Sequence, residues 1–174
     1  MGGESKSPGN PTDWEARLES ALTTGPGPVH LVGVGNRIRT DDAVGLEIVS
    51  TLRSRLRAAP APGLKTHPIS AMPERLLSRL ASAPGKIILF DAVDASKSPG
   101  EIVFCTLSET KFGFFATHNI PFRLIPGLAA RANDVFIVGV QPRSLEVGEG
   151  LTDEVRASAE RIVDSVAETA EGIN

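Results

Sequence analysis

The sequence has one cysteine, no long hydrophobic run and no surplus of basic residues, and each shortage excludes a class of protein. Cys105 alone cannot form an intrachain disulfide or a cysteine-rich metal cluster, which favours a reducing, cytoplasmic location. The apolar runs are only as long as strands, so we expect no membrane span. A net charge of −3 disfavours a nucleic-acid surface and offers no polybasic patch for a membrane.

Several common functional motifs are missing as well. Ile38 stands where a dinucleotide-binding fingerprint needs its third glycine. Gly85-Lys86 is followed by Ile87, not by the Ser or Thr of a P-loop. No G-x-S-x-G elbow occurs, and Cys105 lies inside a predicted strand, where a structural thiol is the better interpretation.

Apolar periodicity predicts alternating strands and helices over most of the 174 residues. The expected strands are 29–34, 65–70, 86–90, 101–107 and 134–140, and the expected helices are 12–22, 41–58, 72–81, 118–132 and one beginning near 151. Thr40 is the expected N-cap of the second helix. Its inward stripe recurs every four residues, at Val44, Ile48, Leu52 and Leu56.

This order predicts an α/β fold, a three-layer α/β/α sandwich around a mostly parallel sheet of about five strands. The strand at 101–107 should be antiparallel to the strand before it, because the link between them is too short for a parallel crossover. We divide the chain into an N-terminal extension with a short helix (1–28) and a single α/β domain (29–174). We expect a monomer.

Candidate ligands follow the predicted strands at the edge where such sheets carry their sites. Asp41 and Asp42 follow the first strand, Asp91 follows the third, and His118 lies in a loop before a helix. Two carboxylates and an imidazole suit a borderline divalent ion such as zinc or nickel. His67, near the end of the second strand, is a further candidate.

Each of these residues also has a plain structural interpretation. Asp41 and Asp42 can be acids that favour a helix start, with Asp41 the better candidate for a cap. Asp91 can close an Asx turn, and His118 can cap a helix or lie satisfied in the core. Their joint occurrence at predicted strand ends favours a functional site.

Four motifs in this order resemble the [NiFe]-hydrogenase maturation endopeptidases, and the resemblance spans about 29–166. They are GVGN-x4-DD-x2-G from Gly33, DA-x-D with PGEI from Asp91, THNIP from Thr117 and VGVQP from Val138. The hydrogenase 3 type, which serves formate hydrogenlyase-like enzymes, is most similar because Asp rather than Glu stands at position 42. The chain departs from the family in its longer N-terminal segment and in having His67-Pro68-Ile69-Ser70 where an Asp-Gly-Gly turn is common.

The resemblance implies a cytoplasmic peptidase of the aspartic or metal-dependent type. Its partner would be the precursor of a hydrogenase large subunit, from which it removes a C-terminal extension after nickel insertion. By matching position, Asp42, Asp91 and His118 would be the nickel ligands and the catalytic residues. The nickel would arrive with the substrate, so no permanently bound metal is expected, although another divalent ion could occupy the site.

Two mechanisms stay open from the sequence. Nickel could polarise the scissile carbonyl or activate a water, or one carboxylate could act as general base while nickel serves recognition. The substrate tail is expected to contact the glycine turn at Gly33, Gly35 and Asn36, together with Thr117 and Asn119. Two other classes of function also remain: a non-catalytic nickel-binding accessory protein for hydrogenase assembly, and a small-molecule-binding α/β domain.

Overall fold

The computed structural model describes residues 13–70, 73–110 and 127–173. In chain order the elements are α1 (Asp13–Thr23), β1 (Val29–Val34), η1 (Thr40–Ala43), α2 (Val44–Ala58), β2 (Leu64–Ile69), α3 (Pro73–Leu80), β3 (Lys86–Ala92), β4 (Ile102–Thr106), η3 (Ala129–Arg131), β5 (Val135–Val140) and α4 (Asp153–Ile173). The two η elements are short 3-10 helices. All five predicted strands are present.

The strands form one sheet in the order β2-β1-β3-β5-β4. The pairs β1–β2, β1–β3 and β3–β5 are parallel, and β4 runs antiparallel to β5. The predicted fold class is therefore confirmed, including the single antiparallel strand, and β2 forms one edge of the sheet. β4 forms the opposite edge, next to β5.

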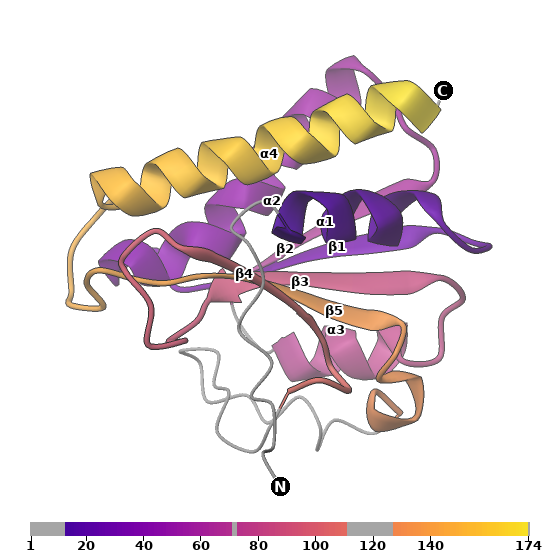
Figure 1. Cartoon of the computed structure of the whole chain (residues 1–174), viewed down its shortest axis with the longest axis horizontal. Helices are drawn as coiled ribbons and strands as arrows, with labels where there is room; N and C mark the ends of the chain where they lie inside the picture. The colour runs from indigo at the N-terminus through magenta and orange to yellow at the C-terminus, as the bar shows by residue number, and fades with distance from the viewer. Residues whose placement is uncertain (1–12, 71–72, 111–126, 174) are drawn as a thin grey trace, which may run out of the picture.

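Helices cover both faces of the sheet, which makes three layers (Figure 1). On one face α1, α2 and α4 bury their apolar stripes against alternate residues of the strands, such as Leu31, Ile88 and Val138. On the other face α3 and Leu128 pack against the intervening residues, such as Val32 and Leu89. The predicted stripe of α2 is buried at Val44, Ile48 and Leu52 and partly buried at Leu56.

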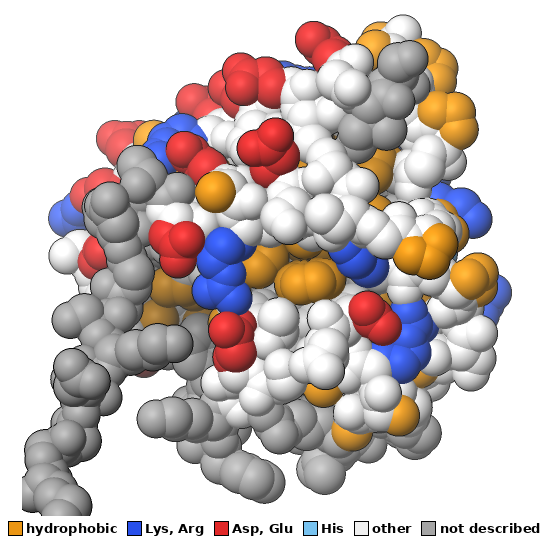
Figure 2. Space-filling model, turned by 45° about the vertical axis from the view of Figure 1, so that its right-hand side comes forward, with side chains coloured by type: hydrophobic (Ala, Val, Ile, Leu, Met, Phe, Trp, Pro, Cys, Tyr) orange, Lys and Arg blue, Asp and Glu red, His pale blue; other side chains and the backbone are white. Residues whose placement is uncertain are grey.

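The N-terminal helix belongs to the main hydrophobic core. Trp14, Leu18 and Leu22 of α1 are buried in the same cluster as α2 and α4. Between α1 and the strands β4 and β5 lies a shallow groove, which has Phe104 and Phe136 among its lining residues. Figure 2 shows a face of the molecule on which hydrophobic side chains lie in a central hollow beside basic ones.

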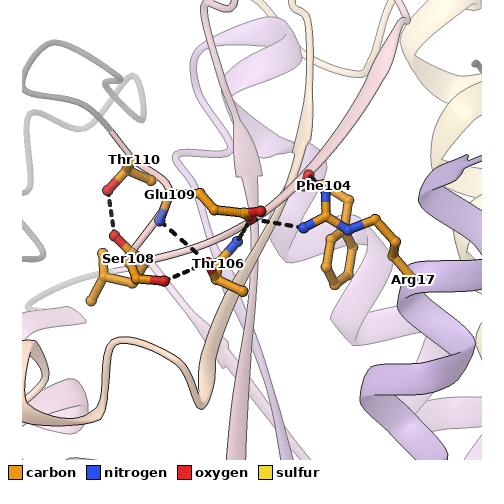
Figure 3. Close-up of polar contacts among 7 residues, drawn as sticks. Arg17, Phe104, Thr106, Ser108, Glu109 and Thr110 are labelled. Carbon is orange, nitrogen blue, oxygen red and sulfur yellow. Dashed lines mark hydrogen bonds and ion pairs between the residues drawn. The ribbon is translucent and has the colours of Figure 1, made fainter. Parts of the chain in front are cut away.

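Side chains close the outer edge of β4 (Figure 3). Arg17 of α1 donates to the Phe104 carbonyl at 2.9 Å, and Glu109 accepts from the Thr106 amide at 2.7 Å. Arg17 and Glu109 form an ion pair with each other at 2.7 Å. The Thr106 amide foremost, and then Arg17, hold the pKa of Glu109 below its usual value. The pair therefore occupies backbone groups that could otherwise pair with another chain.

Three glycines let α2 begin almost in contact with the strands. A Cβ on Gly45 would lie 2.0 Å from the Phe90 carbonyl oxygen, and one on Gly33 would lie 2.1 Å from the Gly45 carbonyl oxygen. A Cβ on Gly35 would lie 2.4 Å from the Asp42 carbonyl oxygen. The glycines of the GVGN motif are therefore needed for packing within the chain.

Gly45→Ala should destabilise the protein by about 3 kcal/mol, because neither the helix backbone nor the β3 carbonyl can move away cheaply. Urea unfolding measures the loss. Gly63→Ala is the matched control, since a Cβ there meets nothing within 4 Å, and its free energy of unfolding should not fall. Equal stability of the two variants would contradict the conclusion that Gly45 is needed for the close packing of α2 on the strands.

The expected start of the second helix is corrected. The segment at 40–43 is a 3-10 helix rather than the first turn of α2, and Thr40 does not cap it. Thr40 has a φ of +26°, and its hydroxyl donates to the carbonyls of Ser144 and Glu146. Of the helix expected at 118–132, the described part contains only the short η3, and the remainder lies outside the described residues.

Candidate functional site

Asp42 and Asp91 lie at the carboxyl edge of the parallel strands, as predicted. Asp91 is the residue before the last in β3, opposite Gly139 of β5. Asp42 is in η1, which contacts β3. Asp91 is 1 % exposed and Asp42 is 5 % exposed, so both residues are buried. One Asp91 oxygen, Oδ1, accepts from the Ala92 amide at 2.8 Å. The strand extends two residues beyond the predicted end at Phe90.

The turn between β1 and η1 places Asp42. The Asn36 side chain accepts from the Ile38 amide at 3.2 Å, which tightens the turn. The Asn36 amide then donates to the Asp42 carbonyl at 3.1 Å, and the Asp42 amide donates to the Arg39 carbonyl at 2.8 Å. These contacts give Asn36 a positioning role, and its contact with a substrate stays a prediction, as do those of Gly33 and Gly35.

Asp41 has a different role from the helix cap expected of it. Its carboxylate is fully buried and accepts from the backbone amides of Arg143, Ser144 and Thr152 at 2.9, 3.0 and 2.7 Å. The Thr152 hydroxyl adds a further donor at 3.0 Å. Asp41 therefore ties η1 to the segment between β5 and α4 and does not cap its own helix.

That segment, residues 141–152, which we call the strap, holds the loop after Asp91 as well. The Gln141 side-chain oxygen accepts from the Ala95 and Lys97 amides at 2.8 and 3.1 Å, and its nitrogen donates to Asp94 at 3.3 Å. The sequence marked VGVQP as a motif without a role for Gln141. A polar residue directly after a buried strand was the available signal.

The strap thus joins the two elements that carry the buried aspartates. Gln141 holds the loop that follows Asp91, and Asp41 anchors the strap beside Asp42. The Thr40 amide donates to the Gly148 carbonyl at 2.9 Å, which adds a backbone contact to the same connection. Residues that lie about 100 positions apart therefore fix the geometry of one edge of the sheet.

The third predicted ligand, His118, lies outside the described residues, as do Thr117 and Asn119. Within the described ranges no group of three or more His, Cys, Asp or Glu side chains is arranged to hold a metal ion. The proposed ligand set of Asp42, Asp91 and His118 therefore stays a prediction. Its two carboxylates are placed at one edge of the sheet.

His67 does not join this edge. It pairs with His30 of β1, whose Nδ1 lies 3.2 Å from His67 Nε2, and the other His30 nitrogen lies 3.3 Å from the Pro84 carbonyl oxygen. Burial is the main cause of the lowered pKa of both imidazoles, and the charges of Lys65 and Arg53 lower that of His67 further. The two rings form a structural pair between neighbouring strands.

Cys105 is a structural thiol, as the sequence indicated. It lies in β4 opposite Ile137, packed against the apolar cluster on the α3 face. Burial foremost, and then the charge of Glu109, raise the pKa of the thiol to about 12. A thiol with so high a pKa carries almost no thiolate at neutral pH and is a poor nucleophile.

Comparison with known proteins defines the family. Residues 70–169 match the family described as HycI, hydrogenase maturation protease, which is more than half of the chain. The protein belongs to the hydrogenase maturation protease family. This membership places it among the proteases, and the family is the one that the sequence motifs resembled.

Solved structures share the fold. A [NiFe] hydrogenase maturation protease HycI from Thermococcus kodakarensis superposes with a TM-score of 0.75 at 24 % identity, covering 89 % of this chain and 99 % of that one. An endopeptidase HycI from Escherichia coli gives a TM-score of 0.63 at 26 % identity, covering 83 % and 90 %. The maturating endopeptidase HybD from E. coli gives 0.61 at 24 % identity, covering 83 % and 93 %.

No helix in the described ranges is both long enough and apolar enough to cross a membrane.

Proposed function

We propose that the protein is an endopeptidase that removes the C-terminal extension of a [NiFe]-hydrogenase large-subunit precursor after nickel has been inserted. Membership of the maturation protease family supports the class of reaction. The observation that carries the proposal further is the pair of buried carboxylates, Asp42 and Asp91, on two contacting elements at one edge of the sheet. The substrate would be recognised by the nickel that it brings.

The donor set fits that recognition. Carboxylate oxygens and an imidazole nitrogen, from Asp42, Asp91 and His118, suit a borderline divalent ion such as nickel. The two aspartates are almost inaccessible to water, and the attraction between a carboxylate and a cation is stronger in such surroundings than in bulk solvent. A nickel ion held by the substrate could therefore anchor the precursor without a resident metal in the protease.

Peptide hydrolysis would then occur beside the anchored ion. A water adds to the scissile carbonyl carbon, the carbon–nitrogen bond breaks, and the leaving amine takes up a proton. The substrate's nickel can promote this attack by polarising the carbonyl or the water. Alternatively, one aspartate can activate the water as general base. In either case Asp42 and Asp91 act in direct contact with the substrate.

Mass spectrometry of a purified large-subunit precursor tests the proposal. Incubation with the protein should shorten the nickel-loaded precursor by a single C-terminal segment and leave the nickel-free precursor intact. Cleavage of both forms at equal rates would overturn nickel recognition. Tight binding of the nickel-loaded form without any loss of mass would show a non-catalytic accessory protein instead.

A further inference from the structure

A groove runs along the outer side of β2, between α2 and α3. Arginines line it from both helices: Arg53 from α2, and Arg75 and Arg79 from α3. Apolar side chains lie between them, among them those of Pro68, Ile69 and Leu76. Because β2 is the edge strand of the sheet, no further strand from the described part of the chain covers this side of it. We call this feature the arginine groove.

The charge of the arginine groove differs from that of the rest of the surface. The chain has a net charge of −3, and within the described ranges five other arginines are paired with acids, as in Arg55–Asp164 and Arg37–Glu47. Arg53 and Arg79 form no ion pair with any other described residue. Burial is the main cause of the lowered pKa of His67, which lines the same groove, and the charges of Lys65 and Arg53 lower it further. The groove therefore favours an anionic occupant.

The position of the groove relates it to the buried aspartates. Ile69, at the carboxyl end of β2, pairs with Val34, the last residue of β1. The next residue along the chain, Gly35, packs against the backbone of Asp42. The part of the groove lined by Ile69 therefore lies at the same end of the sheet as Asp42.

The sequence of β2 indicates how a polypeptide would bind there. Pro68 has no amide hydrogen to offer, which makes this edge poorly suited to pairing with an added strand. Arginine guanidinium groups instead hold carboxylates through two parallel hydrogen bonds. Recognition would depend on side-chain charge, with the apolar floor accepting the intervening residues.

We propose that the arginine groove docks an acidic segment of the protein substrate while the substrate's metal centre lies at Asp42 and Asp91. The proposal rests on the proposed function, since it takes the substrate to be a protein that is processed at this edge. The segment would contribute at least two carboxylates, one for each side of the groove. Docking would add affinity and orientation without touching the reacting bond.

Charge reversal with a matched control tests the proposal. Arg53→Glu and Arg79→Glu should each raise the KM for nickel-loaded precursor about fivefold at low salt, and leave kcat within about twofold. Arg57→Glu makes the same charge change one helical turn along α2, outside the groove, and should leave both constants unchanged. The KM difference between groove variants and control should shrink at high salt.

A second arm separates this proposal from the proposed function. A fluorescein-labelled poly-glutamate peptide should bind the unaltered protein and Arg57→Glu at low salt, and bind the two groove variants at least about fivefold more weakly. If the precursor is never cleaved, the proposed function fails while the peptide still reports on the groove. The proposal that an acidic polypeptide is the occupant would be overturned by either of two results. One is that the groove variants and the control have the same KM and the same affinity for the peptide. The other is that the unaltered protein binds duplex DNA as tightly as it binds the peptide.

Discussion

Asp42→Asn and Asp91→Asn should each slow processing of the nickel-loaded precursor at least about a hundredfold, because each removes a charged group that we propose as a contact of the substrate's nickel. Asparagine has almost the same shape as aspartate, so the packing around η1 and β3 should survive. His118→Ala should have the same effect if that residue completes the ligand set. Single-turnover assays followed by mass spectrometry measure the rates.

Two controls isolate the role of the charge. Asp134→Asn makes the same change at an exposed position directly before β5, at the amino end of that strand and so at the far end of the sheet from Asp42 and Asp91. This variant should process the precursor at the normal rate. Asp42→Glu keeps a carboxylate and should retain more activity than Asp42→Asn. Thermal unfolding of each variant shows whether the fold is intact. A well-folded Asp42→Asn or Asp91→Asn that processes at the normal rate would show that the site is wrongly placed.

Local sequence patterns were sufficient to predict the fold. A continuous apolar run such as Ile87–Leu89 in β3 is typical of a strand buried on both faces, and the four-residue stripe of α2 is typical of a helix on a sheet. The short link before β4 determined its direction. Because parallel strands bring their carboxyl ends together, the same patterns placed Asp42 and Asp91 at one edge.

The roles of Thr40 and Asp41 could not be predicted in this way. A threonine and an aspartate before an apolar stripe form an ordinary helix start, and local propensity favours a cap. The structure instead satisfies both side chains with groups of the strap, about 100 residues further along the chain. No pattern within a short window indicates a contact at that separation.

The neighbours of His67 and of the glycines could not be predicted from the sequence for a related reason. His67 is near the end of its strand in sequence, but the pleat directs its ring toward His30 on the neighbouring strand rather than toward the carboxyl edge. Gly33 and Gly35 indicated a close approach of the backbone, and the chain's own Gly45 and Asp42 make such an approach, while contact of these glycines with a substrate stays a prediction. The sequence predicts that an approach occurs and does not identify what approaches.

Loss of the Asp41 side chain should cost much stability, because this carboxylate anchors the strap. Its carboxylate accepts from three backbone amides and one hydroxyl, and a charged acceptor contributes more per hydrogen bond than a neutral one. Asp41→Ala leaves these donors facing an empty space in a buried position. We expect a loss of about 4 kcal/mol in the free energy of unfolding, measured by urea denaturation.

Comparison with Asp41→Asn and Asp153→Ala tests the physical reason. Asp41→Asn keeps one acceptor oxygen but presents an NH2 group to amides that also donate, so its stability should lie between those of Asp41→Ala and the unaltered protein. Asp153→Ala removes an exposed acid at the start of α4 and should cost less than about 1 kcal/mol. Hydrogen exchange should also quicken at the amides of Ser144 and Thr152 in both Asp41 variants. Unchanged protection at those two amides would mean that the strap is held by the backbone contact between Thr40 and its own Gly148, and that Asp41 only fills space beside Asp42.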